Sequence, residues 1–320
     1  MPMTTCLRGF RGRAIGLASA GLAVAPAFAH GPAPHHPAEL ARAWELDPLV
    51  LAPLLAASVL YGIGLFRLWK GAGRGRGVTG WQALSFAFGI LVLVGALVSP
   101  LDPLGSSLLS AHMAQHGLLA AVAPPLLMHG KPGVVFAWAL AVRWRKPLFG
   151  SAGWHRLAGA LGALARPSPA MVAHGLALWL WHAPFLYEAA LENYAVHAAE
   201  HFTMFGTGLL FWHAMLEARS RRRAAGALAA AFTTMMHCGL LGALITMAPL
   251  PLYPWYAGHG NPWGISVMDD QQFAGLLMWV PMGMVYFACC VLLAQRMIVP
   301  EARRTFTGSV PVCQESPARE

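Results

Sequence analysis

The sequence predicts an all-α membrane protein: a polytopic bundle of seven transmembrane helices with its N-terminus outside and its C-terminus inside. Three observations predict this fold. The 320-residue chain is 57% hydrophobic and 11% charged, whereas soluble proteins carry about 25% charged residues, and its mean hydropathy is +0.53. Apolar runs of roughly 20 residues, the length that a bilayer requires, recur along the chain. The connections between these runs alternate between basic loops and loops that lack Lys and Arg.

The first element is a predicted signal peptide over residues 1–29. Arginines precede a short apolar run at 14–24, and the Ala-Phe-Ala sequence that ends at Ala29 is typical of a cleavage site. Cleavage there leaves His30 at the start of a periplasmic leader over 30–48, which is rich in His and Pro. An uncleaved membrane anchor is the alternative.

The next elements are seven apolar segments, each about long enough to span a bilayer. They cover residues 49–69, 82–99, 108–129, 170–187, 196–216, 227–248 and 272–296. The stretch 130–169 is too interrupted for an eighth span, and its Trp and Arg residues predict an amphipathic segment on the cytoplasmic surface. The predicted organisation is therefore a seven-helix domain over 49–297 and a cytoplasmic tail over 298–320.

The loop charges predict the orientation. Lys and Arg gather in the C-terminal tail and in three loops, 70–81, 130–169 and 217–226. The other loops contain acids and neither Lys nor Arg: 100–107, 188–195 and 249–271. Because basic loops stay in the cytoplasm, the N-terminus is predicted to lie outside. The net charge of +9 is then an orientation signal and not a surface for nucleic acid.

Histidines gather at the predicted outer ends of three helices. His112 and His116 begin the third span, His182 ends the fourth, and His197 and His201 begin the fifth. A spacing of four residues places both imidazoles of a pair on one helix face. An ionisable side chain within a bilayer is costly and marks a functional site. These five side chains therefore predict a metal or haem site near the outer surface.

Further metal donors are predicted with less support. His237 lies midway along the sixth span, Met113 and Met204 lie close to the histidines in sequence, and His30 would offer an α-amine and an imidazole after cleavage. Imidazole suits copper, zinc, iron and nickel, and thioether sulfur favours Cu(I), so copper is the predicted metal. Methionine is equally suited to filling gaps in a core.

Acidic residues are predicted to support the site. Glu200 can orient a ligating imidazole, and Asp102 and Asp270, in the outer loops, can attract the cation or a partner protein. His197-Ala-Ala-Glu200-His201 also fits the H-x-x-E-H pattern of zinc peptidases. No soluble catalytic domain surrounds this pattern, so the chain is not predicted to be an enzyme.

Two other uses of the histidines stay open. A b-type haem, as in a membrane electron carrier or quinol oxidoreductase, needs two histidines on facing helices, and His116 and His201 can supply them. A copper or proton transporter needs a polar path to the inside, but the inner halves of the spans look largely apolar, with His237 as one exception. The isolated histidines are expected to be hydrogen-bonded packing residues: His129, His174 and His213.

Four short motifs contain most of these residues. They are His112-Met-Ala-Gln-His116, Leu178-Trp-Leu-Trp-His182-Ala-Pro, His197-Ala-Ala-Glu200-His201 and Asp270-Gln-Gln-Phe-Ala-Gly. Together they resemble the CtaG-type cytochrome c oxidase assembly factors of bacteria, over about residues 49–297. The resemblance implies a multi-pass protein of the bacterial plasma membrane that assists copper-centre maturation in a haem–copper terminal oxidase. It implies terminal oxidase subunits as partners, with periplasmic copper chaperones as candidate donors of the metal.

Overall fold

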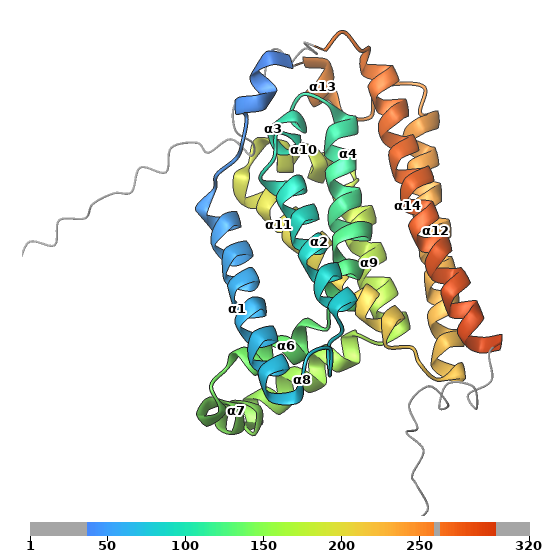
Figure 1. Cartoon of the computed structure of the whole chain (residues 1–320). Coiled ribbons are helices and arrows are strands. Elements are labelled where there is room, and N and C mark those ends of the chain that lie inside the picture. Colours follow the sequence, from blue (N-terminus) through green and yellow to red (C-terminus); the bar gives the residue numbers. More distant parts are fainter. Residues whose placement is uncertain (1–36, 259–262, 299–320) are drawn as a thin grey trace, which may run out of the picture.

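The protein is a bundle of helices that stand side by side (Figure 1). The computed structural model describes residues 37–258 and 263–298, and these residues contain helices and no strand. The predicted all-α fold is therefore confirmed for the described residues. The predicted signal peptide, His30 and nearly all of the predicted tail lie outside them. The chain enters the described region through a short 3-10 helix, Pro37–Arg42.

Four helices among the described residues are long and apolar enough to cross a membrane. They are α1 (Pro48–Ala72), α2 (Gly80–Leu97), α12 (Arg221–Met247) and α14 (Val267–Ile298). A fifth candidate is a pair, Leu109–His129 with Pro132–Ala139, which is bent by 58°. The full set of seven spans remains a prediction.

The third predicted span is one helix in three parts. α4 (Leu109–Gly117) continues through a π-helical turn, η2 (Leu118–Val122), into α5 (Ala123–His129). Pro124 and Pro125 follow the π turn and lack the amide hydrogens that an α-helix needs. A π turn re-registers the backbone at such a point and is frequent beside functional sites.

Part of the predicted surface segment 130–169 packs against a helix of the bundle. α6 (Pro132–Ala139) lies against α1, with Val135 fully buried. A Cβ on Gly64 would lie 2.0 Å from the Val135 carbonyl oxygen, so only glycine allows this approach. The rest of the segment, α7 (Val142–Phe149) and α8 (Ala152–Leu164), matches the prediction better, since α8 buries none of its residues.

The fourth predicted span, 170–187, is broken near its end. α9 (Pro167–Trp181) stops at His182, and α10 (Pro184–Glu192) starts two residues later. Pro184 causes the break, because a residue before proline avoids the helical region, and Ala183 accordingly has ψ 127°. α11 (Tyr194–Leu216) covers the fifth predicted span with 23 residues.

The connections gather at two ends of the bundle (Figure 1). At one end, called the α13 end here, lie α3 (Leu101–Leu104), α10 and α13 (Pro254–Gly258). At the other, the α8 end, lie α6, α7 and α8. The loops that lack Lys and Arg are at the α13 end and the basic loops are at the α8 end. The predicted separation of loop charges is therefore present in three dimensions.

Candidate metal site

α4 presents two buried imidazoles to each other. His112 and His116 have no exposed surface, and their Nε2 atoms are 2.9 Å apart. Two donors about 2.0 Å from one ion, at angles between about 90° and 110°, are separated by about 2.8–3.3 Å. The same distance fits a single N–H···N hydrogen bond. The helix thus holds the pair in a geometry that either a proton or a metal ion can bridge.

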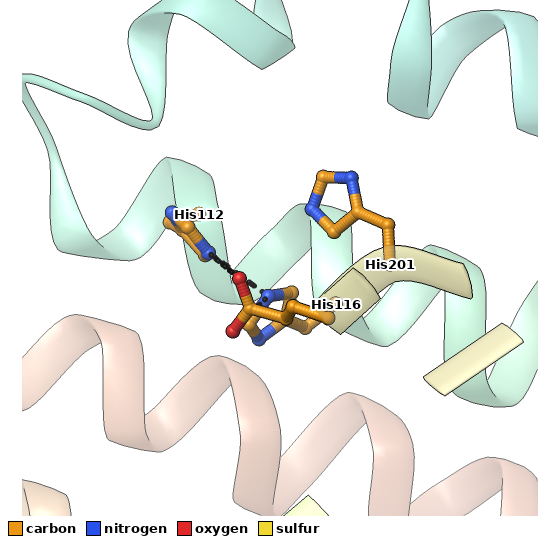
Figure 2. A group of neighbouring side chains, drawn as sticks. His112, His116 and His201 are labelled. Atoms are coloured by element: carbon orange, nitrogen blue, oxygen red, sulfur yellow. Dashed lines mark hydrogen bonds and ion pairs between the residues drawn. The ribbon is translucent and has the colours of Figure 1, made fainter. Parts of the chain in front are cut away.

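α11 brings a carboxylate and a third imidazole to this pair. Glu200 Oε1 lies 3.4 Å from His116 Nε2, and Glu200 Oε2 lies 3.7 Å from His112 Nε2. With His201, the four residues offer ligand atoms that all lie within 4.8 Å of one another. Figure 2 shows the side chains of His112, His116 and His201 close to one another. Glu200 was predicted to orient a ligand, but its carboxylate lies among the candidate ligand atoms themselves.

A second group of candidate ligands shares His201. Asp102 of α3, His197 and His201 also offer atoms within 4.8 Å of one another. The His197 and His201 rings are 4.0 Å apart between centroids, and His197 lies 5.7 Å from His112. Four of the five predicted outer histidines are thus brought together, with His201 the least buried of them.

The buried polar atoms of the site are incompletely hydrogen-bonded. Among the described residues, neither carboxylate oxygen of Glu200 has a hydrogen-bond partner, and neither has His116 Nδ1. Burying a carboxylate that accepts no hydrogen bond costs several kcal/mol. A cation between the carboxylate and the Nε2 atoms of the imidazoles would supply the contacts that the Glu200 oxygens lack, and this mixed nitrogen and oxygen set suits zinc, copper or iron. The residues present therefore fit a metal ion.

The start of α4 is held by Asp270, from α14. Leu108 at the N-cap position offers no side-chain hydrogen bond, and Asp270 accepts instead from the amides of Leu109 (2.7 Å) and Ser110 (3.2 Å). The Ser110 hydroxyl also donates to it. A carboxylate at a helix N-terminus stabilises the orphan amides and the helix dipole. Asp270 was predicted to attract the cation or a partner. In the structure it caps the N-terminus of α4, the helix that carries His112.

Gln115 was missed by the sequence reasoning and links the site to α2 and α3. Its amide donates to Asp102 Oδ1 (2.6 Å) and to the Ala96 carbonyl (2.8 Å). Its side chain has no exposed surface. The available signal was a polar residue next to His116 inside an apolar helix. Asp102 is therefore held by Gln115 while it faces His197.

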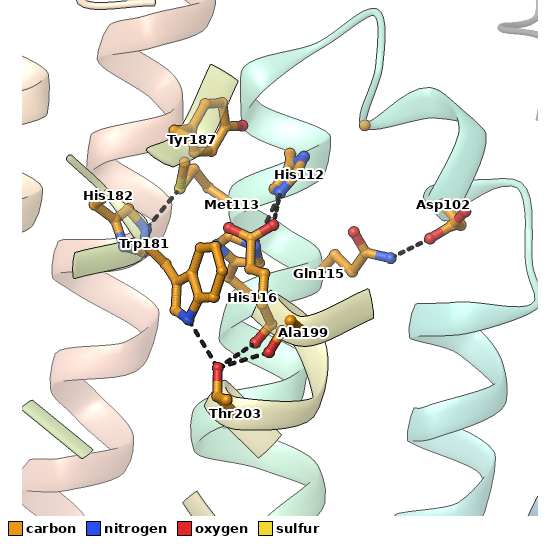
Figure 3. Close-up of polar contacts among 12 residues, drawn as sticks. Asp102, His112, Met113, Gln115, His116, Trp181, His182, Tyr187, Ala199 and Thr203 are labelled. Carbon is orange, nitrogen blue, oxygen red and sulfur yellow. Dashed lines mark hydrogen bonds and ion pairs between the residues drawn. The ribbon is translucent and has the colours of Figure 1, made fainter. Parts of the chain in front are cut away.

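His182 and Met113 meet beside the carboxylate site. His182 caps the end of α9, and its Nδ1 lies 2.6 Å from the Leu178 carbonyl oxygen. Its Nε2 lies 3.2 Å from the sulfur of Met113 (Figure 3). The His182 and His116 ring centroids are 5.3 Å apart. The structure thus pairs His182 with sulfur.

The weaker candidates lie elsewhere or beyond the described residues. His237 accepts a hydrogen bond from Trp179 at 3.4 Å and lies against Gly175 of α9. Met204 is fully buried in the apolar core. His30 precedes the described region. His237 is therefore not among the side chains that gather with the imidazoles of α4 and α11.

Three tyrosines to which the sequence analysis assigned no role lie beside the site. The Tyr187 ring is 4.9 Å from the His112 ring, and its hydroxyl lies 2.8 Å from that of Tyr256. Tyr253 donates to the carbonyl of His182 at 3.0 Å. Burial raises the pKa of both Tyr253 and Tyr256, so these phenols stay protonated as hydrogen-bond donors. The three tyrosines therefore pack beside the site without adding charge.

Comparison with known proteins gives one family and two relatives. The sequence model of the cytochrome c oxidase caa3 assembly factor family (Caa3_CtaG) matches residues 59–299, a range that includes the whole site. The chain is 26% identical over 258 residues to the uncharacterized proteins Mb0105 of Mycobacterium bovis and MT0111 of Mycobacterium tuberculosis. These matches cover 78% of the chain but 38% of each relative. The chain thus spans well under half the length of these relatives. No solved structure matches the chain.

Proposed function

The chain belongs to the cytochrome c oxidase caa3 assembly factor family, and we propose that it assists copper-centre maturation of a haem–copper terminal oxidase at the periplasmic side of the plasma membrane. The observation that supports this proposal is the buried site of His112, His116, Glu200 and His201. Copper is the cargo in this proposal. The protein binds it and passes it on without catalysing a reaction.

The composition of the site suits temporary binding. Three imidazoles and one carboxylate can hold a copper ion, and that ion would give the oxygens of Glu200 a contact in place of the hydrogen bonds that they lack among the described residues. His201 is half-buried, whereas His112 and His116 are fully buried. A partner can therefore reach the ion by way of His201. His197 and Asp102, next to His201, form a second step on that route.

The position of the site supports delivery from outside. In this proposal all seven predicted segments cross the bacterial plasma membrane, and the α13 end faces the periplasm. The support is that loops lacking Lys and Arg lie at the α13 end, whereas basic loops lie at the α8 end. Oxidase subunits are the partners that the family indicates. Periplasmic copper chaperones would supply the ion.

The geometry argues against a haem ligated by His116 and His201. Their ring centroids are 5.9 Å apart, a spacing that two axial ligands could have. A porphyrin would need a wide flat slot between them. Ligand atoms of Glu200 and His112 lie within 4.8 Å of theirs and fill that region. An intense Soret band in the purified protein would contradict the copper proposal.

Gene deletion with site-specific complementation tests this function. Oxidase activity and oxidase copper content are measured with and without added copper, and oxidase subunit levels are measured by immunoblot. We expect the deletion strain and a strain with His116→Asn to lose both activity and copper. The matched control His237→Gln, a histidine outside the cluster, restores them. Full oxidase activity and copper content in the deletion strain under copper limitation would refute the proposal.

A further inference from the structure

Met113 and His182 present two metal-binding atoms to each other in a buried place. His182 Nε2 and Met113 Sδ are 3.2 Å apart, and the side chains are 4% and 1% exposed. They come from helices far apart in sequence, α4 and α9. Pro184 and Tyr253 hold His182, since Pro184 ends α9 at this point and Tyr253 donates to the His182 carbonyl. The contact is therefore positioned by the fold.

The hydrogen bonds of His182 determine what its Nε2 can do. The Leu178 carbonyl oxygen is an acceptor only, so Nδ1 carries the proton in their 2.6 Å hydrogen bond. The neutral imidazole then has its lone pair on Nε2. Thioether sulfur has no proton and also presents lone pairs. Two electron-pair donors thus face each other, and a cation between them turns this contact into a favourable one.

The distance suits one shared ion. Donors about 2.0 Å (nitrogen) and about 2.3 Å (sulfur) from one metal, at an angle of about 100°, lie about 3.3 Å apart. Thioether sulfur favours Cu(I), whereas carboxylate and imidazole suit divalent ions. We propose that Met113 and His182 form a second metal site, selective for Cu(I), beside the carboxylate site. This inference rests on the proposed copper-handling function.

His116 lies between the two sites. Its Nε2 faces His112 and Glu200, and its ring packs edge-on against that of His182 at 5.3 Å between centroids. An ion at the sulfur site is therefore one imidazole away from the carboxylate site. The pair gives the protein a place to hold copper in its cuprous form, apart from the set that favours divalent ions.

Metal titration of the purified full chain in detergent tests the second site. Cu(I) is titrated without oxygen against a chromophoric chelator, and Zn(II) is titrated separately as the divalent probe. Met113→Leu is expected to weaken Cu(I) binding at least about tenfold and to change Zn(II) affinity less than twofold. Met204→Leu, which alters another fully buried methionine, is the matched control and should change neither. Glu200→Gln should weaken Zn(II) binding and leave Cu(I) binding largely intact.

A spectroscopic measurement needs no substitution and covers the case in which Met113→Leu does not fold. The protein is labelled with selenomethionine and loaded with one equivalent of Cu(I). X-ray absorption at the copper edge should show a Cu–Se contact. Its absence in the labelled, loaded protein would refute the second site.

The outcomes separate this inference from the proposed function. Equal weakening of Cu(I) and Zn(II) binding in Met113→Leu would show one shared site and overturn the inference, while copper handling would stand. Wild-type Cu(I) affinity in a folded Met113→Leu protein would also overturn it. Normal oxidase copper in the deletion strain would instead refute the proposed function, even if the purified protein bound Cu(I) through Met113.

Discussion

Two regions of this bundle bury histidines, and they differ in whether the buried polar atoms have hydrogen-bond partners. At the α13 end, His116 and Glu200 have buried atoms without hydrogen-bond partners among the described residues. Further along α9, His174 is equally buried, but its Nδ1 lies 3.3 Å from the Thr207 hydroxyl and its Nε2 lies 2.9 Å from the Tyr286 hydroxyl. Burial alone does not distinguish the regions. The difference is whether the protein itself satisfies the polar atoms.

The neighbours of His174 explain its structural role. Its ring stacks on Phe211 with centroids 5.3 Å apart, and Tyr286 stacks on Trp212 at 5.6 Å. These rings join α9, α11 and α14 inside an apolar core, and the two hydrogen bonds of His174 link α9 to α11 and to α14. As expected from the sequence, His174 is a hydrogen-bonded packing residue. At the α13 end, by contrast, both carboxylate oxygens of Glu200 and Nδ1 of His116 have no hydrogen-bond partner among the described residues, an arrangement that suits an ion-binding site.

The largest expected effect comes from Glu200→Gln. We expect divalent-metal affinity, measured by titration of the purified protein, to fall by about 100-fold, near the upper end of the range for metal-site supporting residues. The metal-free variant should keep or slightly raise its thermal unfolding midpoint, because a buried charge without hydrogen bonds is removed. A metal-free variant that unfolds several degrees earlier would show that Glu200 is structural and would erase the contrast with His174.

The matched control for that experiment is Glu217→Gln. Glu217 lies at the end of α11, 49% exposed and 3.1 Å from Arg219. Exposed ion pairs contribute about 0–1 kcal/mol. The control should therefore change neither the metal affinity nor the unfolding midpoint.

Asp270→Asn is expected to have an intermediate effect. The substitution removes the charge that accepts from the Leu109 and Ser110 amides, at a cost of about 1–2 kcal/mol in stability. Because α4 carries His112 and His116, metal affinity should also fall severalfold. Scanning fluorimetry and metal titration on the same samples measure both. Thr79→Ala, which removes the cap of α2, is the control, because that helix carries none of the grouped ligands. Unchanged metal affinity in Asp270→Asn would show that the cap of α4 does not orient the imidazoles.

Much of the site could be predicted from sequence because it depends on local spacing. The pairs His112/His116 and His197/His201 share helix faces through the four-residue repeat, and the loop charges placed both pairs at the same end. The break at Pro184 was also visible, since proline marks a probable helix boundary. Hydropathy nevertheless predicts one continuous span over 170–187, because the apolar run continues through Pro184.

The remaining features depend on packing between distant segments. Asp270 reaches α4 from 160 residues away along the chain, and Tyr256 reaches the Gly105 carbonyl across 151. The Met113–His182 contact depends on how α4 and α9 are rotated about their axes and how far one is shifted along the other. Hydropathy and periodicity report the exposed face of each helix, but they do not report which side chain lies opposite.

The smallest expected effect is that of Tyr286→Phe, which tests the structural member of the comparison. The change removes one buried hydroxyl that hydrogen-bonds His174 and keeps the ring that stacks on Trp212. Leaving His174 Nε2 without its partner should lower stability by about 1–2 kcal/mol. Metal affinity and oxidase copper should stay at wild-type values, because His174 is not among the grouped ligands. A loss of metal binding in a Tyr286→Phe protein with a normal unfolding midpoint would show that the two regions are coupled. It would also show that the hydrogen-bonded His174 contributes to metal binding.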